Sequence, residues 1–257
     1  MKKNSFFYII AIAAGAILLN SCGIEEYPYI DPIPQGNIDP LFNNRATVYI
    51  PNGYERPFDH FVIFYRIYVS DFEQPSTSPS MFSAINKALV DDYNSILPYI
   101  GSETVVNANM NTVFSARKYK YLVLEGDDIN SVLSYDRSIM GKTLIFDFGS
   151  FKAPTMTVAA SSSSTTGLTY SLLRSDGSGA FKPLPENRYF INSEELWKAS
   201  NINENVNADV VNKDGIDASR KPYTFAAMFV AAMGTVGYTT VYSTPAFIHA
   251  FQLPEQW

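Results

Sequence analysis

The sequence contains a single cysteine, Cys22, and only two histidines and two tryptophans among 257 residues. One cysteine excludes an intramolecular disulfide and any metal site built from several thiolates. Basic residues number 19 against 25 acidic ones, which gives a formal net charge of -6. An acidic chain repels a phosphate backbone, so nucleic acid is not an expected partner.

What the sequence has instead is a high content of apolar and aromatic residues, at 46% and 14%. That composition supports a folded core, and the 17 Tyr and 18 Phe favour strands over helices. The sequence therefore predicts a mainly β globular protein, not a disordered or fibrous one.

The N-terminus has the organisation of an export signal. Lys2 and Lys3 precede an unbroken apolar run of fourteen residues, 6–19, after which Asn20, Ser21 and Cys22 follow. As a helix this run would rise about 21 Å, against about 30 Å of bilayer hydrocarbon, so it is short for a membrane span. We predict a cleaved signal peptide over residues 1–21. The alternative is an uncleaved anchor helix.

Residues 19–22, Leu-Asn-Ser-Cys, resemble the lipobox of bacterial lipoproteins. The resemblance implies that the Cys22 thiol receives a diacylglycerol and that the amino group of Cys22 is acylated, for example with palmitate. Two such chains suffice for stable membrane anchoring. Glu25 and Glu26 are similar to the surface-export signals of Bacteroidetes-type lipoproteins. The resemblance thus implies an outer-membrane lipoprotein of the cell envelope, and leaves open whether it faces the periplasm or the surface.

The next segment, residues 22–44, carries the lipidated cysteine and four prolines, at 28, 32, 34 and 40. Proline fixes φ and removes a hydrogen-bond donor, so neither a helix nor a central strand is expected. We predict a semi-extended tether of up to roughly 60 Å. Some of its apolar residues are expected to dock on the domain that follows.

Residues 45–257 are predicted to form one domain. Residues 58–70 are the strongest strand, and because both of their faces are apolar the strand should be central. A helix is predicted over 79–97, and a short one over 194–200 with Leu196 and Trp197 buried. Residues 201–220 are predicted to be irregular. The other predicted strands are 46–50, 118–125, 142–148, 154–159, 167–174, 223–233, 238–243 and 246–253.

Two parts of this domain resemble fibronectin type III domains. PFDHFVIFYRIYVSD looks like the central strand of that family, and YTFAAMFVAAMGTVGYTTVYSTPAFI like its penultimate strand, hairpin and closing strand. Tyr223 stands where the tyrosine-corner residue would be. The resemblance implies an immunoglobulin/fibronectin III-like β-sandwich elaborated by a long, partly helical insertion over about 72–220. With its lipobox and tether, the chain also resembles uncharacterised spirochaete lipoproteins.

No group of residues makes a recognisable catalytic or metal centre, and no cofactor is expected. His60 and His249 lie in predicted strands, where partly exposed structural histidines are expected, and a zinc site would need further ligands from distant loops. Ser178 sits in a predicted turn, and no nucleophile elbow occurs. Exposed Trp197 and Trp257 would be candidates for a sugar- or protein-binding face. The other acidic candidates are read as helix, cap or turn residues: Asp91/Asp92, Asp127/Asp128, Glu194/Glu195, and a weak calcium set of Asp209, Asp214 and Asp217.

We therefore predict a membrane-anchored lipoprotein that displays a non-catalytic domain for binding a protein or a glycan, or as a scaffold. The alternative is an envelope hydrolase, or an accessory domain of one, with its acids or histidines supplied by the insertion loops. A histidine hydrogen-bonded to a carboxylate in a cleft would favour the alternative. A shallow aromatic surface without such a pair would favour the binding domain.

Overall fold

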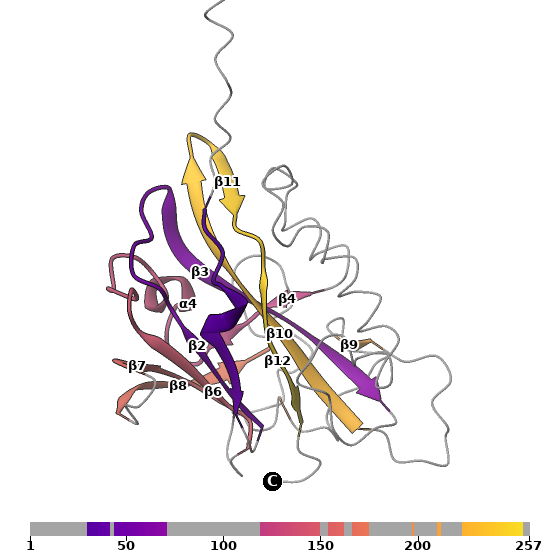
Figure 1. Cartoon of the computed structure of the whole chain (residues 1–257). Helices are drawn as coiled ribbons and strands as arrows, with labels where there is room; N and C mark the ends of the chain where they lie inside the picture. The colour runs from indigo at the N-terminus through magenta and orange to yellow at the C-terminus, as the bar shows by residue number, and fades with distance from the viewer. Residues whose placement is uncertain are drawn as a thin grey trace, which may run out of the picture.

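The computed structural model describes residues 30–41, 44–70, 119–149, 154–161, 166–174, 197, 210–211 and 223–253 (Figure 1). The predicted signal peptide, Cys22 and the predicted helix over 79–97 lie outside these residues. Within the described residues no helix has the length and apolar character needed to cross a bilayer.

The described part of the chain is mainly β, as the composition predicts. Beside the strands there is a 3-10 turn, η1 (Gln35–Asn37), and a four-residue helix, α4 (Ile129–Val132). The strands are β1 (Ile38–Leu41), β2 (Arg45–Tyr49), β3 (Phe58–Ser70), β4 (Lys120–Tyr121), β5 (Val123–Leu124), β6 (Thr143–Asp147), β7 (Thr155–Ala159), β8 (Gly167–Leu173), β9 (Val210–Val211), β10 (Tyr223–Val236), β11 (Thr239–Tyr242) and β12 (Ala246–Gln252).

These strands form two sheets. The first has the order β1-β2-β6-β7-β8-β5, and each neighbouring pair in it is antiparallel. The second has the order β11-β10-β3-β4, with β12 also paired to β10 and β9 paired in parallel to β3. Buried residues from both sheets belong to one hydrophobic cluster, among them Val48 and Phe146 of the first sheet and Ile63 and Met228 of the second. The two sheets therefore pack against each other as a sandwich.

The strand β3 is central, as predicted from its two apolar faces. It pairs along its length with β10, from Tyr223 opposite Ser70 to Gly234 opposite Phe58, and its other edge is met by β4 and β9. Side chains of both faces are at most 1% exposed: Phe61, Ile63, Tyr65 and Ile67 on one, Val62, Phe64 and Tyr68 on the other. Burial on both sides explains why this strand lacks the polar-apolar alternation of a surface strand.

One short segment belongs to both sheets. Tyr121 in β4 lies opposite Phe64 of β3, whereas Val123 in β5 lies opposite Leu173 of β8. Leu122, between them, is fully buried and donates its N–H to the carbonyl of Ile63. The sequence predicts one strand over 118–125, and the structure divides it because the chain passes from one sheet to the other at this residue.

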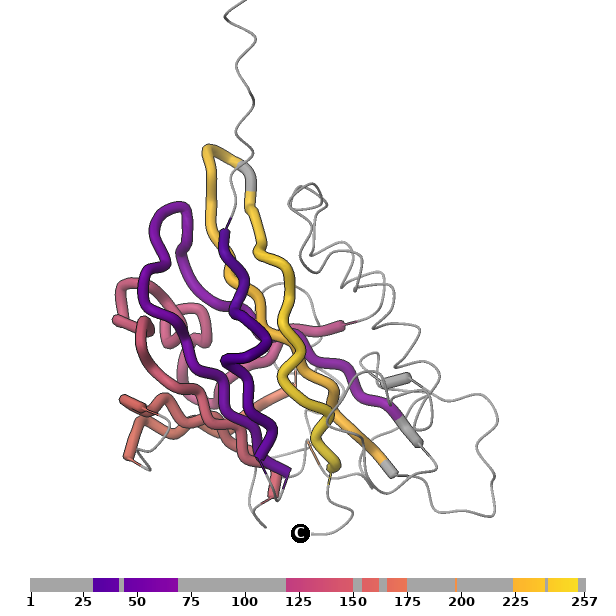
Figure 2. Tube along the Cα trace, in the orientation of Figure 1, coloured from indigo at the N-terminus to yellow at the C-terminus, as the bar shows by residue number. Residues whose placement is uncertain are grey.

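The folded body begins before Arg45, the predicted start of the domain. Ile30, Ile33 and Ile38 are buried in the common core, and β1 pairs with β2 at the edge of the first sheet. This segment runs beside β12 (Figure 2). Pro40 lies within β1. An edge strand tolerates a proline, because on its outer side no neighbouring strand requires a backbone N–H donor.

Two side-chain amides join this segment to the free edge of β12. Gln35 donates to the carbonyl of Phe247 at 2.8 Å and accepts from its N–H at 3.2 Å. Asn44 donates to the carbonyl of Gln252 at 2.6 Å and accepts from its N–H at 2.8 Å. Asn44 also donates to the carbonyl of Phe148 at 3.0 Å. These amides satisfy backbone groups that a neighbouring strand would otherwise satisfy, and they link the two sheets along this side.

The range 72–220, predicted as an insertion, contains much of the sandwich itself. Four of the six strands of the first sheet, β5 to β8, come from within it. The bounds of the predicted insertion follow from the fibronectin III resemblance, which covers β3 and the strands from β10 onward, so the strands predicted between them fell within the insertion. Residues 201–220, predicted to be irregular, contribute β9.

Candidate functional site

The first candidate, His60, does not form a catalytic pair among the described residues. It lies in β3 opposite Met233 and forms a backbone bridge with Ser134. Its Nε2 is buried without a hydrogen-bond partner in the described part of the chain. Burial lowers the pKa of His60, and the charges of Asp59 and Asp128 oppose that shift only in part. The imidazole is therefore neutral at pH 7.

Ser134 is not oriented as a nucleophile beside this histidine. Its hydroxyl donates to the carbonyl of Ser131 at 2.8 Å and accepts from the N–H of Arg137 at 3.2 Å. Both contacts stabilise the turn that follows α4. A serine activated for catalysis would instead donate to the imidazole.

The second histidine, His249, is a packing residue. It is 6% exposed, not partly exposed as expected from sequence, and its ring meets that of Phe251 edge-on at 5.0 Å. Burial lowers the pKa of His249 to about 4. It lies in β12 opposite Met228, on the face that enters the common core. No carboxylate is hydrogen-bonded to His249 in the described part of the chain, and its burial there leaves little of the ring open to a substrate.

Of the acidic candidates, the structure describes Asp127 and Asp128, and the side chain of Asp127 is exposed. Asp128 is the N-cap of α4 and accepts from the N–H of Asn130 at 3.1 Å, in agreement with the predicted cap. Across the described residues, no three His, Cys, Asp or Glu side chains are grouped to hold a metal ion. The other acidic candidates and Ser178 lie outside the described residues: Asp91, Asp92, Glu194, Glu195, Asp209, Asp214 and Asp217.

Trp197 is not available for binding, because it is fully buried, as predicted, whereas Leu196 lies outside the described residues. Its indole N–H donates to the carbonyl of Leu172 at 2.8 Å, and its ring lies 5.4 Å from Tyr65 and 5.5 Å from Phe148. It thus joins residues of both sheets in the core. Trp257 and the side chain of Tyr223 lie outside what the structure describes.

The described side chains include three exposed tyrosines, Tyr49, Tyr135 and Tyr238, and the last two lie toward the same end of the sandwich. Gly237 and Tyr238 form the turn between β10 and β11, with φ of +61° at Gly237, and Val236 and Thr239 pair across it. Glycine at the first central position of a two-residue hairpin loop supplies the positive φ that this turn requires. Tyr238 is fully exposed, at 107% of its reference area, and Val236 is exposed at 38%.

Tyr135 belongs to the same end. Its N–H donates to the carbonyl of Asp59 at 2.8 Å, its ring lies 6.5 Å from that of Phe58, and Phe58 is opposite Gly234 near the hairpin turn. Tyr135 is 52% exposed. We call the region of Tyr135, Val236 and Tyr238 the hairpin end. It exposes two tyrosines and a valine, and these side chains suit contact with a ligand or surface, not bond cleavage.

Neither Tyr135 nor Tyr238 is among the residues predicted to form a site. Tyr238 was assigned to the start of a strand, where alternation would bury it in a sheet. The signal that identifies it is Gly237, because a glycine between two β runs marks the turn and leaves its neighbour exposed. For Tyr135 no local pattern distinguishes exposure from burial.

Comparisons with known proteins returned no matching family model, no similar curated protein and no similar solved structure.

Proposed function

We propose that this protein is an exported bacterial lipoprotein, held in the outer membrane by lipid on Cys22, that displays a non-catalytic sandwich for binding a protein or a glycan. The observation that carries the proposal is the sequence Leu-Asn-Ser-Cys directly after the apolar run, with Cys22 as the chain's one cysteine. A thiol at that point is the substrate of lipoprotein processing, and two acyl chains give stable anchoring.

The start of the folded body supports this anchoring. Ile30 is 3% exposed in the core and lies only eight residues after Cys22. The chain has no second cysteine, so the Cys22 thiol forms no intramolecular disulfide. Its position suits a thiol that serves as an attachment point beside the body.

We further propose that the sandwich is of the fibronectin III-like type. The order β11-β10-β3 in the second sheet supports this assignment, because the resembling central strand, penultimate strand and closing hairpin are expected to be neighbours in that order. Such sandwiches host many unrelated functions, so the assignment of a binding role relies on the surface. Among the described residues the exposed large hydrophobic side chains are Tyr49 and Leu168 on the first sheet, and Tyr135, Val236 and Tyr238 at the hairpin end.

No feature of the described residues favours the hydrolase alternative. Neither His60 nor His249 is hydrogen-bonded to a carboxylate there, and the pKa of each is lowered by burial. A general base needs a geometry in which it meets its proton donor.

The anchor is tested by metabolic labelling with palmitate in a bacterium that processes lipoproteins. We expect wild type and the control Ser21→Ala to carry label and to sediment with membranes, because both retain the thiol. Cys22→Ala should lose both properties. Label retained in Cys22→Ala would refute the anchor assignment.

A further inference from the structure

The N-terminal segment enters the sandwich at the hairpin end. Ile30 lies against Gly234, where its Cδ1 would be 2.9 Å from a side-chain carbon added to that glycine. The carbonyl of Pro57 approaches Gly234 as well. Gly234 is only two residues before Val236, the last residue of β10. Ile30, the first residue that the structure describes, therefore lies beside β10 near the β10–β11 hairpin (Figure 2).

The number of residues between Cys22 and Ile30 limits how the body can be oriented on a membrane. Eight residues separate Cys22 from Ile30, and they span at most about 28 Å when fully extended. Eleven residues separate Tyr223, at the far end of β10, from Gly234, a strand length of about 36 Å. If the far end rested on the bilayer with β10 upright, Ile30 would be farther from the lipid than the tether reaches. With the hairpin end down, the turn lies about 10 Å beyond Gly234 and well within reach.

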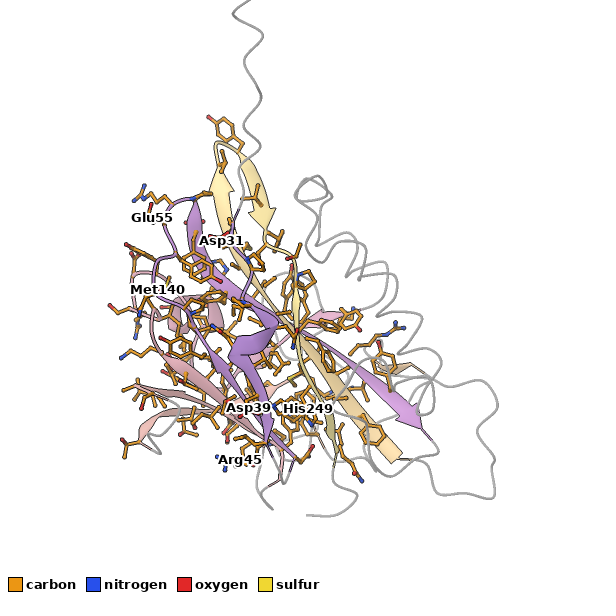
Figure 3. All side chains as sticks on the ribbon, in the orientation of Figure 1. Asp31, Asp39, Arg45, Glu55, Met140 and His249 are labelled. Carbon is orange, nitrogen blue, oxygen red and sulfur yellow. The ribbon has the colours of Figure 1, made fainter. Side chains whose placement is uncertain are left out.

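The tip of the hairpin has the chemistry of a bilayer interface. Residues 234–240, Gly-Thr-Val-Gly-Tyr-Thr-Thr, contain no charged side chain, and Tyr238 is fully exposed at the apex. A tyrosine ring is apolar with a polar hydroxyl, and it favours the headgroup region where both are satisfied. Nearby exposed charges are of both signs: Asp31, Glu55 and Arg56. Figure 3 shows Asp31 and Glu55 toward this end, and Asp39, Arg45 and His249 toward the other.

We propose that the β10–β11 hairpin is a second membrane contact, in which Tyr238 enters the lipid headgroup layer and turns the hairpin end toward the bilayer. This inference rests on the proposed lipid anchor at Cys22. The lipid supplies the attachment, and the hairpin fixes the orientation. Because the tip has no basic patch, the contact requires no anionic lipid and is insensitive to salt.

An environment-sensitive fluorophore can test this contact in the full lipidated protein. Acylation blocks the thiol of Cys22, so a cysteine introduced at an exposed position is the one site that a maleimide dye can label. The probe is attached through Thr240→Cys at the tip, with Asp39→Cys on β1 as the matched control. Both residues are exposed in the folded protein. The proteins are reconstituted in phosphatidylcholine vesicles that carry a lipid-bound quencher.

We expect the emission of the dye at position 240 to shift to shorter wavelength and to be quenched by the lipid, while the dye at position 39 remains as in water. Adding Tyr238→Ser to the Thr240→Cys protein should reduce both effects, since the serine lacks the ring. These responses should be equal at low and high salt.

A dye at position 240 that responds no more than the dye at 39, in protein that still floats with the vesicles, would overturn the inference and leave the anchor intact. An unchanged response after Tyr238→Ser would overturn the role given to the ring. Failure of the anchor itself has a different signature. Wild-type protein would then react with the maleimide at Cys22 and would not float with the vesicles.

Discussion

Asn44 offers a direct test of how the two sheets are held together. Its side chain makes three hydrogen bonds, two with Gln252 of β12 and one with Phe148 after β6. Its backbone has a φ of +59°, in the left-handed region that asparagine tolerates better than most residues. Replacement by alanine therefore has two separate effects, the loss of these bonds and the strain of a Cβ residue at positive φ.

The expected loss follows from these two effects. Each hydrogen bond contributes about 1 kcal/mol net, and because Asn44 is only partly buried, water replaces some of what is lost. The bonds thus account for about 2–3 kcal/mol, and the positive φ adds about 1 kcal/mol for alanine. Glycine adopts this φ without strain, so Asn44→Gly should lose only the stability that the hydrogen bonds contribute. The difference between the two variants isolates the strain.

The assay is equilibrium unfolding of the mature chain in urea, followed by tryptophan fluorescence. Trp197 is fully buried, so its emission reports the exposure of the core. Asn37→Ala is the matched control, because Asn37 makes a single exposed bond to the carbonyl of Tyr49 at 3.2 Å. That variant should lose less than about 1 kcal/mol. An Asn44→Ala protein as stable as Asn37→Ala would refute the role of this amide as a link between the sheets.

Two further predictions concern buried groups. The pKa of His249 in the folded chain, about 4, is below its ordinary value of 6.5. The contribution of the neutral ring to the free energy of unfolding should therefore be fully present above pH 6.5, and the free energy should fall by up to about 3 kcal/mol as the pH is lowered toward 4. Urea midpoints measured across this range should show a smaller fall for His249→Gln than for wild type, with His60 supplying a remaining part; equal falls would contradict the prediction. Gly234→Ala should destabilise by several kcal/mol, because the added carbon meets the carbonyl of Pro57, whereas Gly36→Ala meets nothing within 4 Å and should be near neutral. Thermal unfolding compares the two, and equal midpoints would show that the contact at Gly234 is easily relaxed.

The strands that sequence patterns identify best are those whose burial follows a simple period. Phe58–Ser70 has the predicted bounds, because an apolar run of that length with aromatic and β-branched residues suits a central strand. The strands β6, β7 and β8 agree with prediction to within a residue or so at each end. Their short length and flanking polar residues mark where each begins and ends.

Other features depend on contacts that no local pattern contains. β1 was read as tether because of its proline, yet the edge of a sheet accommodates Pro40. α4 has only four residues, too few for a helical period to be visible. The break between the predicted strands 223–233 and 238–243 is shorter in the structure. There β10 continues to Val236, because Gly234 is needed where Pro57 approaches, not where the chain reverses. The same shift places Tyr238 in the exposed turn and not at the start of a strand.

The passage of the chain from one sheet to the other at Leu122 has a consequence for how the protein folds. Neither sheet is a self-contained unit, because a strand of each lies within the same five residues, Lys120–Tyr121 and Val123–Leu124. A fragment that ended before this segment would lack β5 to β8, and one that began after it would lack β3 and its partner β4. The body should therefore melt as one cooperative unit, and a nascent chain gains a stable core only after β10 has been synthesised and paired with β3.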